Sequence, residues 1–396
     1  MRAAKRIERR PVPDSIQALS QFHPVLARVY AARRIVSPAQ VGTVLTHLHR
    51  ADSLSQIDHA AELLARAVCE GQRILIVGDF DADGATSCAL GVRALRAMGA
   101  RDVQYLVPNR FEYGYGLTPE IVALAEQRAP RVLVTVDNGI SSHEGVAAAK
   151  AAGMVVVITD HHLPGPALPP ADAIVNPNQP GDGFPSKHLA GVGVIFYVLS
   201  ALRAKLREAD WFEVSGLGPP NLAQWLDLVA LGTVADVVPL DDNNRILVAQ
   251  GVARIRRGHC LPGVLALLEA AGRFHERVVA SDLGYAVAPR LNAAGRLEDM
   301  SLGIECLLAD DLEAARASAR ELDALNHARR GIEREMQEQA LSLLQDIALD
   351  GDATQLPAGL CLYDSRWHQG VIGILAGRIK DRVHRPVIAL ADVGAG

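Results

Sequence analysis

The stretch RILIVGDFDADGATS, residues 73–87, joins a short run of large aliphatic residues to three aspartates that alternate along the chain. The length and composition of residues 74–77 are typical of a strand that is buried on both faces. An Ala-rich segment, SCALGVRALRAMG (87–99), follows and has a helical pattern. We therefore expect a buried strand, an acidic turn and a helix.

The same alternation recurs downstream. Further apolar runs are VQYLVPN (103–109), RVLVTVDNG (131–139), MVVVITDHH (154–162) and DAIVNPN (172–178), and TPEIVALAEQR (118–128) is helical in pattern. Short strands separated by helices of this length are typical of βαβ units. The sequence therefore predicts an α/β fold with a parallel sheet.

Changes of pattern along the chain predict four regions. Residues 1–70 read as helical, with apolar spacing in 38–48 and 57–68, and residues 71–305 hold the parallel-sheet domain. Residues 306–350 read as a long connecting helix, because Leu325, Ile332, Met336, Ala340, Leu343 and Ile347 recur at three-, four- or seven-residue spacing. A new α/β pattern occupies 351–396, and we expect this second domain to be cut short.

Composition limits the class of protein. The chain of 396 residues has a net charge of −5, which excludes a globally basic nucleic-acid coat protein but not a local basic track. The five cysteines lie far apart without a CxxC pair, which disfavours a disulfide framework or a zinc ribbon. With no signal-peptide pattern and no apolar run near the ~18 residues that span a bilayer, we expect a cytoplasmic protein without membrane contact.

Acidic residues and histidines follow three of the predicted strands. Ligands of open parallel sheets bind beyond the carboxyl ends of the strands, so we expect these groups to converge. A further carboxylate, Asp236, lies in the apolar segment LVALGTVADVVPL (228–240), where a buried charge needs a partner. The candidate site therefore comprises Asp79, Asp81, Asp83, Asp137, the run Asp160-His161-His162, and Asp236.

Simpler interpretations exist for each residue alone. A single Asp after a strand is commonly the N-cap of the next helix, and Asp83 fits that role. Two adjacent histidines commonly form a polar turn. Neither interpretation explains why all these groups occupy equivalent strand ends, whereas a divalent cation makes several clustered carboxylates tolerable. We therefore predict a metal centre.

The ligand types predict the metal and its chemistry. Mixed carboxylate and imidazole ligands favour Mn²⁺ or Mg²⁺ over structural Zn²⁺. So many ligands suggest two ions that share a bridging carboxylate, an arrangement that activates water for in-line attack on phosphorus. No Walker loop is present and no GxGxxG follows the first strand, so nucleotide-driven and dinucleotide chemistries lack support.

Eight ordered blocks resemble the DHH phosphoesterase superfamily, and within it the exonucleases specific for single-stranded DNA. The blocks are VGDFDADGATS (77–87), PNRFEYGYGL (108–117), VTVDNGIS (134–141), TDHHLPG (159–165), LAGVGV (189–194), GTVADVVPLDDNNR (232–245), APRLNAAGR (288–296) and WHQGVIGI (367–374). The resemblance implies a DHH domain joined by a long helix to a DHHA1 domain, with DNA between them. It also implies 5′→3′ release of mononucleotides in DNA repair and recombination.

The resemblance also implies roles for individual residues. The metal ligands would be Asp81, Asp83, Asp137, His161 and Asp236. Asp137 would bridge the two ions, and His162 would face the scissile phosphate. Many members carry a histidine at the position of Val77, so Asp79 becomes a candidate substitute ligand or helper. We do not recognise the family's glycine- and histidine-rich DHHA1 motif or its OB-like domain in these residues, so we expect the grip on DNA and the binding of partners to differ from those of the family.

Three further segments supply candidate substrate contacts. Asn109, Arg110 and Tyr115, with Tyr113, follow the second strand, where Arg and Tyr suit phosphate clamping and base stacking, or else aromatic packing. APRLNAAGR, expected to be loop-like, offers phosphate contacts or else helix capping and a salt bridge. Residues 367–369 precede a predicted helix. They could bind phosphate at the start of that helix, or Trp367 could instead pack in the joint between the two domains. The candidates in these last two segments are Arg290, Asn292, Arg296, Trp367, His368 and Gln369.

The expected partners are single-stranded DNA, a single-stranded-DNA-binding protein and a helicase, with the chain itself a monomer. Two other functions stay open at this point. One is a DHH phosphodiesterase of short oligonucleotides or cyclic dinucleotides, and the other is a non-catalytic DNA-binding relative. The inactive relatives lose metal ligands, whereas this chain keeps them.

Overall fold

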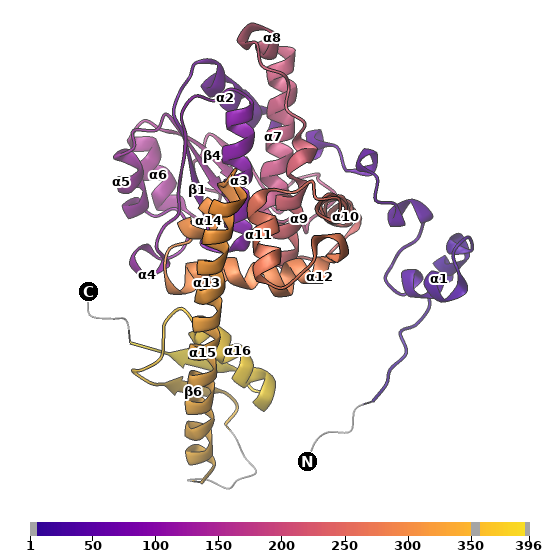
Figure 1. Cartoon of the computed structure of the whole chain (residues 1–396), viewed down its shortest axis with the longest axis vertical. Helices are drawn as coiled ribbons and strands as arrows, with labels where there is room; N and C mark the ends of the chain where they lie inside the picture. Colours follow the sequence, from indigo (N-terminus) through magenta and orange to yellow (C-terminus); the bar gives the residue numbers. More distant parts are fainter. Residues whose placement is uncertain (1–5, 350–356, 393–396) are drawn as a thin grey trace.

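A five-stranded, fully parallel sheet forms the centre of the protein (Figure 1). The computed structural model describes residues 6–349 and 357–392. The strand order is β2-β1-β3-β4-β5. From β1 the chain first adds β2 on one side and then returns to add β3, β4 and β5 on the other side. The strand order therefore reverses between β1 and β3, and this topological switch point is where open α/β sheets bind their ligands. The strands are β1 (Ile74–Gly78), β2 (Val103–Leu106), β3 (Val132–Val136), β4 (Val155–Thr159) and β5 (Ala173–Val175). The predicted α/β fold is confirmed.

Both faces of the sheet are covered by helices. Ile74 and Ile76 face the core formed with α2 (Ile57–Cys69), α3 (Ala82–Ala97) and α7 (Gly191–Glu208). Their neighbours Leu75 and Val77 face the opposite core, formed with α5 (Pro119–Glu126) and α6 (His143–Ala151). Side chains alternate between the faces of a strand, so continuous apolar strands require this two-sided cover. The short helix α4 (Arg110–Tyr113) follows β2.

A second helical layer packs on α3 and α7. Helix α9 contacts both of them and also α10, while α14 contacts α3 and the long helix α15. This layer brings residues far apart in sequence to the carboxyl ends of the strands. Its helices are α9 (Leu226–Ala235), α10 (Asp242–Arg256), α11 (Pro262–Ala270), α12 (Ala280–Asp282), α13 (Ala288–Leu297) and α14 (Ser301–Leu308), while the short α8 (Trp211–Ser215) lies apart from this layer at the end of α7 (Figure 1).

Most of the long helix predicted for residues 306–350 is present as α15 (Leu312–Leu349), but the prediction was wrong at its start, because residues 306–308 end α14 and a break separates the two helices. At 1.5 Å per residue α15 is about 57 Å long, and it reaches from the main body to a small second unit (Figure 1). That unit contains β6 (Leu360–Tyr363), α16 (Ile372–Val383) and β7 (Val387–Leu390), with the two strands parallel. Its core joins α16 to Met336 and Ala340 of α15. The side chain of Ile347, used in the periodic pattern, lies outside the described residues.

Two local predictions were wrong. Residues 38–48 form only two short 3-10 turns, Pro38–Val41 and Leu45–His47, because Gly42 is extended and the neighbouring β-branched residues disfavour helix. APRLNAAGR is helix α13 rather than a loop, with Pro289 in its first turn and alanines along it. The rest of the N-terminal region holds α1 (Pro24–Ala31), α2 and the 3-10 helices Asp14–Leu19 and Ala51–Ser53. No helix in the described part of the chain is both long and apolar enough to cross a bilayer.

Candidate metal centre

The acidic and histidine side chains predicted to converge do so at the carboxyl ends of β1, β3 and β4. Their ligand atoms form three overlapping groups, within each of which all atoms lie within 4.8 Å of one another. The groups are Asp79 with Asp81 and Asp137, Asp83 with His161 and Asp236, and Asp137 with His161 and His162. Because Asp137 and His161 belong to two groups each, the three form one centre at the switch point of the sheet.

The turn after β1 is held by its own aspartates. Asp81 is the N-cap of α3, and its Oδ1 accepts from the backbone N–H groups of Asp83 and Gly84. The alternative that made Asp83 the N-cap is therefore wrong. The carboxylate of Asp83 instead accepts from the N–H groups of Gly191 (2.7 Å) and Val192 (3.0 Å) at the start of α7. This helix terminus stabilises a buried carboxylate.

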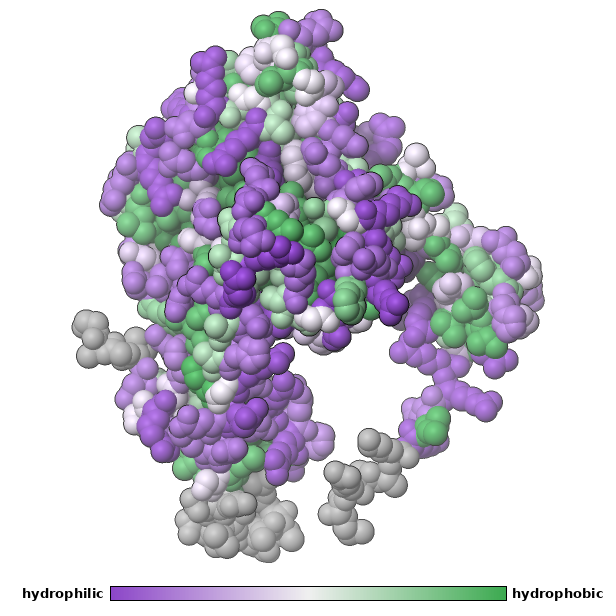
Figure 2. All heavy atoms as spheres, viewed as in Figure 1, coloured by the Kyte–Doolittle hydropathy of each residue, from purple (hydrophilic) through white to green (hydrophobic). Residues whose placement is uncertain are grey.

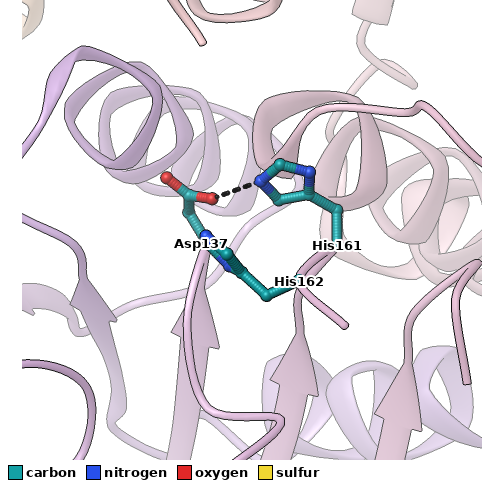
Figure 3. Close-up of side chains that lie close together, drawn as sticks. All are labelled: Asp137, His161 and His162. Atoms are coloured by element: carbon teal, nitrogen blue, oxygen red, sulfur yellow. Dashed lines mark ion pairs between the residues drawn. The ribbon is translucent and has the colours of Figure 1, made fainter. Parts of the chain in front are cut away.

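Asp137 lies at the middle of the centre. Its backbone is in the left-handed region, with φ of 62°, which is strained for a residue other than glycine. Its Oδ1 lies 3.0 Å from Nε2 of His161, and Figure 3 shows the two groups pointing toward one another. A Cβ at Gly191 would lie 2.6 Å from this same oxygen, so only glycine leaves room for the carboxylate there.

Asp236 enters from the helical layer. It is the C-cap of α9, and its Oδ2 lies 3.5 Å from Nε2 of His161. Gly232, one turn earlier in α9, faces Asp83: a Cβ there would lie 2.6 Å from Oδ1 of Asp83. The glycines of LAGVGV and GTVADVV thus let two helices approach the carboxylates closely.

The residues present fit a cation. Oδ1 of Asp137 and Nε2 of His161 are buried without a hydrogen-bond partner, although each faces the other. Burial, with the charges of neighbouring carboxylates, raises the pKa of Asp79, Asp83 and Asp236 to about 7, and that of Asp137 well above its usual value. Burial lowers the pKa of His161, which keeps its imidazole neutral and able to ligate. Clustered carboxylates and a neutral imidazole are the ligand set of Mn²⁺ or Mg²⁺.

The sequence matches a known protein family and several of its members. Residues 73–233 match the family described as DHH family, N-terminal domain. The single-stranded-DNA-specific exonuclease RecJ of Dickeya dadantii (strain 3937) is 56% identical over all of this chain, which covers 68% of that protein. The chain belongs to the RecJ family.

Solved structures of RecJ proteins share its fold. A crystal structure of exonuclease RecJ bound to manganese is 37% identical, with a TM-score of 0.73 over 85% of this chain and 80% of that one. A RecJ from Thermus thermophilus in complex with Mg²⁺ is 31% identical, with a TM-score of 0.69 over 96% of this chain and 49% of that one. The RecJ fold thus holds both of the metals that the ligand types predict.

His162, the second histidine of the RecJ-type DHH run, is oriented by Asp160. The buried Asp160 accepts through Oδ1 from Nδ1 of His162 at 2.7 Å, and through Oδ2 from the backbone N–H of Ile140 at 2.9 Å. The hydrogen bond to Asp160 raises the pKa of His162 to about 9. Although burial opposes it, this bond also holds the pKa of Asp160 below its usual value. His162 is therefore a protonated imidazole, partly exposed beside the centre.

The segment after β2, which includes the short helix α4, borders the centre. The Tyr115 hydroxyl lies 3.4 Å from the His162 ring nitrogens, and the Arg110 guanidinium lies 4.3 Å from the Phe80 ring centroid. Burial lowers the pKa of Arg110, whose charge faces Asp79 and Asp81. Asn109 caps α4 by accepting from the N–H of Phe111.

The three candidate substrate contacts on helix α13, Arg290, Asn292 and Arg296, have different surroundings. Arg290 is buried, forms an ion pair with Asp323 of α15 at 2.7 Å, and donates a hydrogen bond to the Ala286 carbonyl. Of the two interpretations of this arginine, the structure therefore has the salt bridge rather than a free phosphate contact. Oδ1 of Asn292 accepts from the N–H of Ala82, and so holds the acidic turn after β1.

Arg296 lies nearer the centre. Burial lowers its pKa, and the charge of Arg110 adds to this effect, which indicates two arginines beside the same space. Its Nη1 donates to the Gly370 carbonyl at 3.3 Å.

The segment before α16 lies at the joint between the two units. Trp367 is buried in the core shared with α15, and its Nε1 donates a hydrogen bond to Gln339. Trp367 therefore packs the joint between the units, as the second of its two interpretations proposed. His368 is partly buried and packs edge-on against Phe111 of α4, with ring centroids 6.0 Å apart. Gln369 is also partly exposed at this joint. Segments 109–111 and 368–370 thus meet beside the metal centre.

The sequence analysis did not predict several features of the site. The bond from Asp160 to His162 could have been expected from their spacing in one turn. The roles of Phe80, Gly191 and Gly232 had no local signal, because each depends on an element distant in the sequence.

Proposed function

We propose that this chain is a metal-dependent exonuclease that hydrolyses single-stranded DNA from the 5′ end and releases 5′-mononucleotides. The observation that carries the proposal is the convergence of carboxylates and a neutral histidine at the sheet switch point in a chain of the RecJ family. Such a centre suits phosphodiester hydrolysis, and no side-chain nucleophile is required.

Asp81, Asp83, Asp137, His161 and Asp236 would hold two Mn²⁺ or Mg²⁺ ions, with Asp137 between them and Asp79 as an additional ligand or helper. When bound, the ions supply activation of water and neutralisation of phosphoryl charge. The chain itself sets the geometry. The start of α7 fixes Asp83, and the strained backbone of Asp137 aims its carboxylate into the centre.

His162 is proposed to bind the scissile phosphate. Because Asp160 keeps the imidazole protonated at neutral pH, it offers a charged N–H donor beside the carboxylate cluster. This donor stabilises negative charge that develops on the phosphoryl oxygens. Tyr115, next to His162, is placed to pack against the terminal nucleotide.

The strand is proposed to enter between the main body and the α16 unit. Arg110 and Arg296 would bind phosphate there, with Asn109, His368 and Gln369 beside them. Asn292 supports the acidic turn, while Arg290 and Trp367 support the fold.

We further propose a cytoplasmic monomer acting with a single-stranded-DNA-binding protein and a helicase in repair and recombination. Its domains would be the N-terminal segment, the DHH domain, the long helix α15 (Leu312–Leu349) and a DHHA1 region after it.

The test is digestion of single-stranded DNA labelled at either end, with Mn²⁺ or Mg²⁺ in turn. We expect mononucleotides from the 5′ end, and abolished turnover with retained DNA binding in Asp137→Ala. Asp52→Ala, a remote exposed change, is the matched control. Full activity of Asp137→Ala would contradict the assignment.

Strand length separates the alternatives. Cleavage that falls as strands lengthen would indicate a phosphodiesterase of short oligonucleotides. Binding without any release of nucleotides would indicate a non-catalytic relative.

A further inference from the structure

Charge is segregated between the N-terminal region and the rest of the chain. Residues 1–50 contain nine arginines and lysines but two acidic residues, out of 40 basic and 45 acidic residues in all. The remaining chain therefore has 31 basic and 43 acidic residues, a net charge of −12 against +7 for the first fifty. A modest overall charge of −5 conceals a strongly basic segment on an acidic body.

The basic segment includes a small unit of its own, the N-terminal arm (residues 6–36). Leu19, Ala27, Ala31 and Ile35 form a hydrophobic cluster separate from the core of the body. The chain is tied to the body further on, where Arg245 of α10 donates to the Gln40 carbonyl at 2.7 Å. Figure 1 shows α1 standing to one side of the helical layer.

Four arginines of the arm line one hollow of about 730 Å³. The other lining residues are apolar, and none of the lining residues is acidic; the hollow is lined by Arg9, Arg10, Arg28 and Arg33 with Val12, Ile16, Val29 and Ala32. Among the residues that the structure describes, none of these four guanidinium groups has a carboxylate partner within ion-pair distance. Figure 2 shows hydrophobic side chains within a hydrophilic rim on this part of the molecule.

We propose that this hollow binds the sugar-phosphate backbone of single-stranded DNA, outside the active site. Four unpaired guanidinium groups facing one space repel one another, and a polyanion relieves that repulsion. Guanidinium forks match phosphate oxygens, and all four arginines are exposed to solvent and so accessible to a strand. The proposal rests on the proposed function, because the occupant is the part of the substrate strand that the metal centre does not hold.

The contact would be independent of base sequence. The aromatic residues of the arm, Phe22 and Tyr30, pack against each other edge-on with ring centroids 5.2 Å apart, and neither lines the hollow. Without an aromatic platform the surface contacts phosphates rather than bases. It would therefore affect affinity and salt dependence for long strands, but not cleavage of short ones.

The test measures DNA binding against salt concentration in the Asp137→Ala background, with a long homopolymeric strand. Each phosphate contact contributes about 0.7 to the slope of log K against log salt for single strands. Because this slope is negative, Arg→Ala exchange at positions 9, 10, 28 and 33 should make it shallower by about 3, with weaker binding at low salt. Lysines at the same positions should restore most of the slope. The matched control replaces Arg101, Arg207, Arg257 and Arg277, exposed arginines of the body.

Each outcome decides the matter. An unchanged slope in the alanine variant, or an equal loss in the control, overturns the proposal. Binding of anionic vesicles that the variant loses, with an unchanged DNA slope, assigns the hollow to lipid and also overturns it. A trinucleotide should be cleaved equally by the arm variant and the unmodified chain. Failure of the unmodified chain to cleave any strand would refute the proposed exonuclease, and leaves the binding result intact because that is measured without turnover.

Discussion

Replacing Asp160 by Asn tests how His162 is kept charged. Asp160 accepts from the backbone N–H groups of Ile140, His161 and His162 and from Nδ1 of His162. Asn has one acceptor oxygen where Asp has two, so one of these donors loses its partner and an NH₂ group is buried in its place. An unsatisfied buried group of this kind costs about 1–3 kcal/mol of unfolding free energy.

The larger effect of Asp160→Asn is on charge. The hydrogen bond to Asp160 raises the pKa of His162 to about 9 from its ordinary 6.5. Without that carboxylate the pKa falls toward 6.5, so at pH 8 His162 changes from mostly protonated to mostly neutral. The same shift makes the stability of the folded chain depend on pH. The protonated His162–Asp160 pair stabilises the fold fully below pH 6.5, and this contribution to the unfolding free energy is lost as the pH rises through about 9.

The assay is the pH dependence of single-turnover cleavage of end-labelled single-stranded DNA at saturating Mn²⁺. We expect the alkaline limb of the profile to move to lower pH in Asp160→Asn, while Mn²⁺ affinity measured by calorimetry changes little. Asp172→Asn, which removes the ion pair with Lys150 away from the centre, is the control. An alkaline limb at the same pH in Asp160→Asn and the unmodified chain would refute this account of His162.

Further predictions concern the centre and the helices around it. Gly232→Ala places a Cβ 2.6 Å from Oδ1 of Asp83, so we expect a loss of about 1–3 kcal/mol in stability and weaker Mn²⁺ binding, measured by thermal melts and calorimetry. Because burial raises the pKa of the centre's aspartates to about 7, the metal-free protein should lose stability as pH rises from 4 to 7. Mn²⁺ at a hundredfold excess over Kd should add about 2.7 kcal/mol, and its effect on melting should be greater at pH 8 than at pH 5. Arg290→Ala breaks the buried pair with Asp323 and should cost roughly 2–3 kcal/mol of stability, whereas Arg296→Ala should mainly raise KM; equal melting temperatures for the two would contradict this division.

Much of the centre could be predicted because it depends on local order along the chain. Each apolar run that enters Asp or His is a buried strand in the structure, and parallel strands present their carboxyl ends at one edge. That Asp236 requires a partner also followed from composition, because its neighbours in the sequence are apolar, whereas its place at the end of α9 did not.

Roles that depend on distant partners could not be predicted in the same way. Whether an arginine in APRLNAAGR is paired or free depends on where α15 passes, and Asp323 selects Arg290 for the structural role. Trp367 packs in the core because α15 lies beside it, whereas His368, the next residue, faces α4. The N-terminal arginines gave no signal as a surface until α1 and the preceding extended segment placed them around one hollow.

The sequence by itself determined the strands, their acidic ends and the ligand types, because burial on both faces of a sheet and the chemistry of clustered carboxylates are set by residue identity and spacing. The tertiary structure decided which carboxylate caps which helix, which arginines stay unpaired, and where glycine is required. Those outcomes depend on distances between elements far apart in the chain, such as the start of α7 against Asp83 and α9 against the same carboxylate. Electrostatic and steric interactions change over a few ångströms, and no spacing along the chain specifies them.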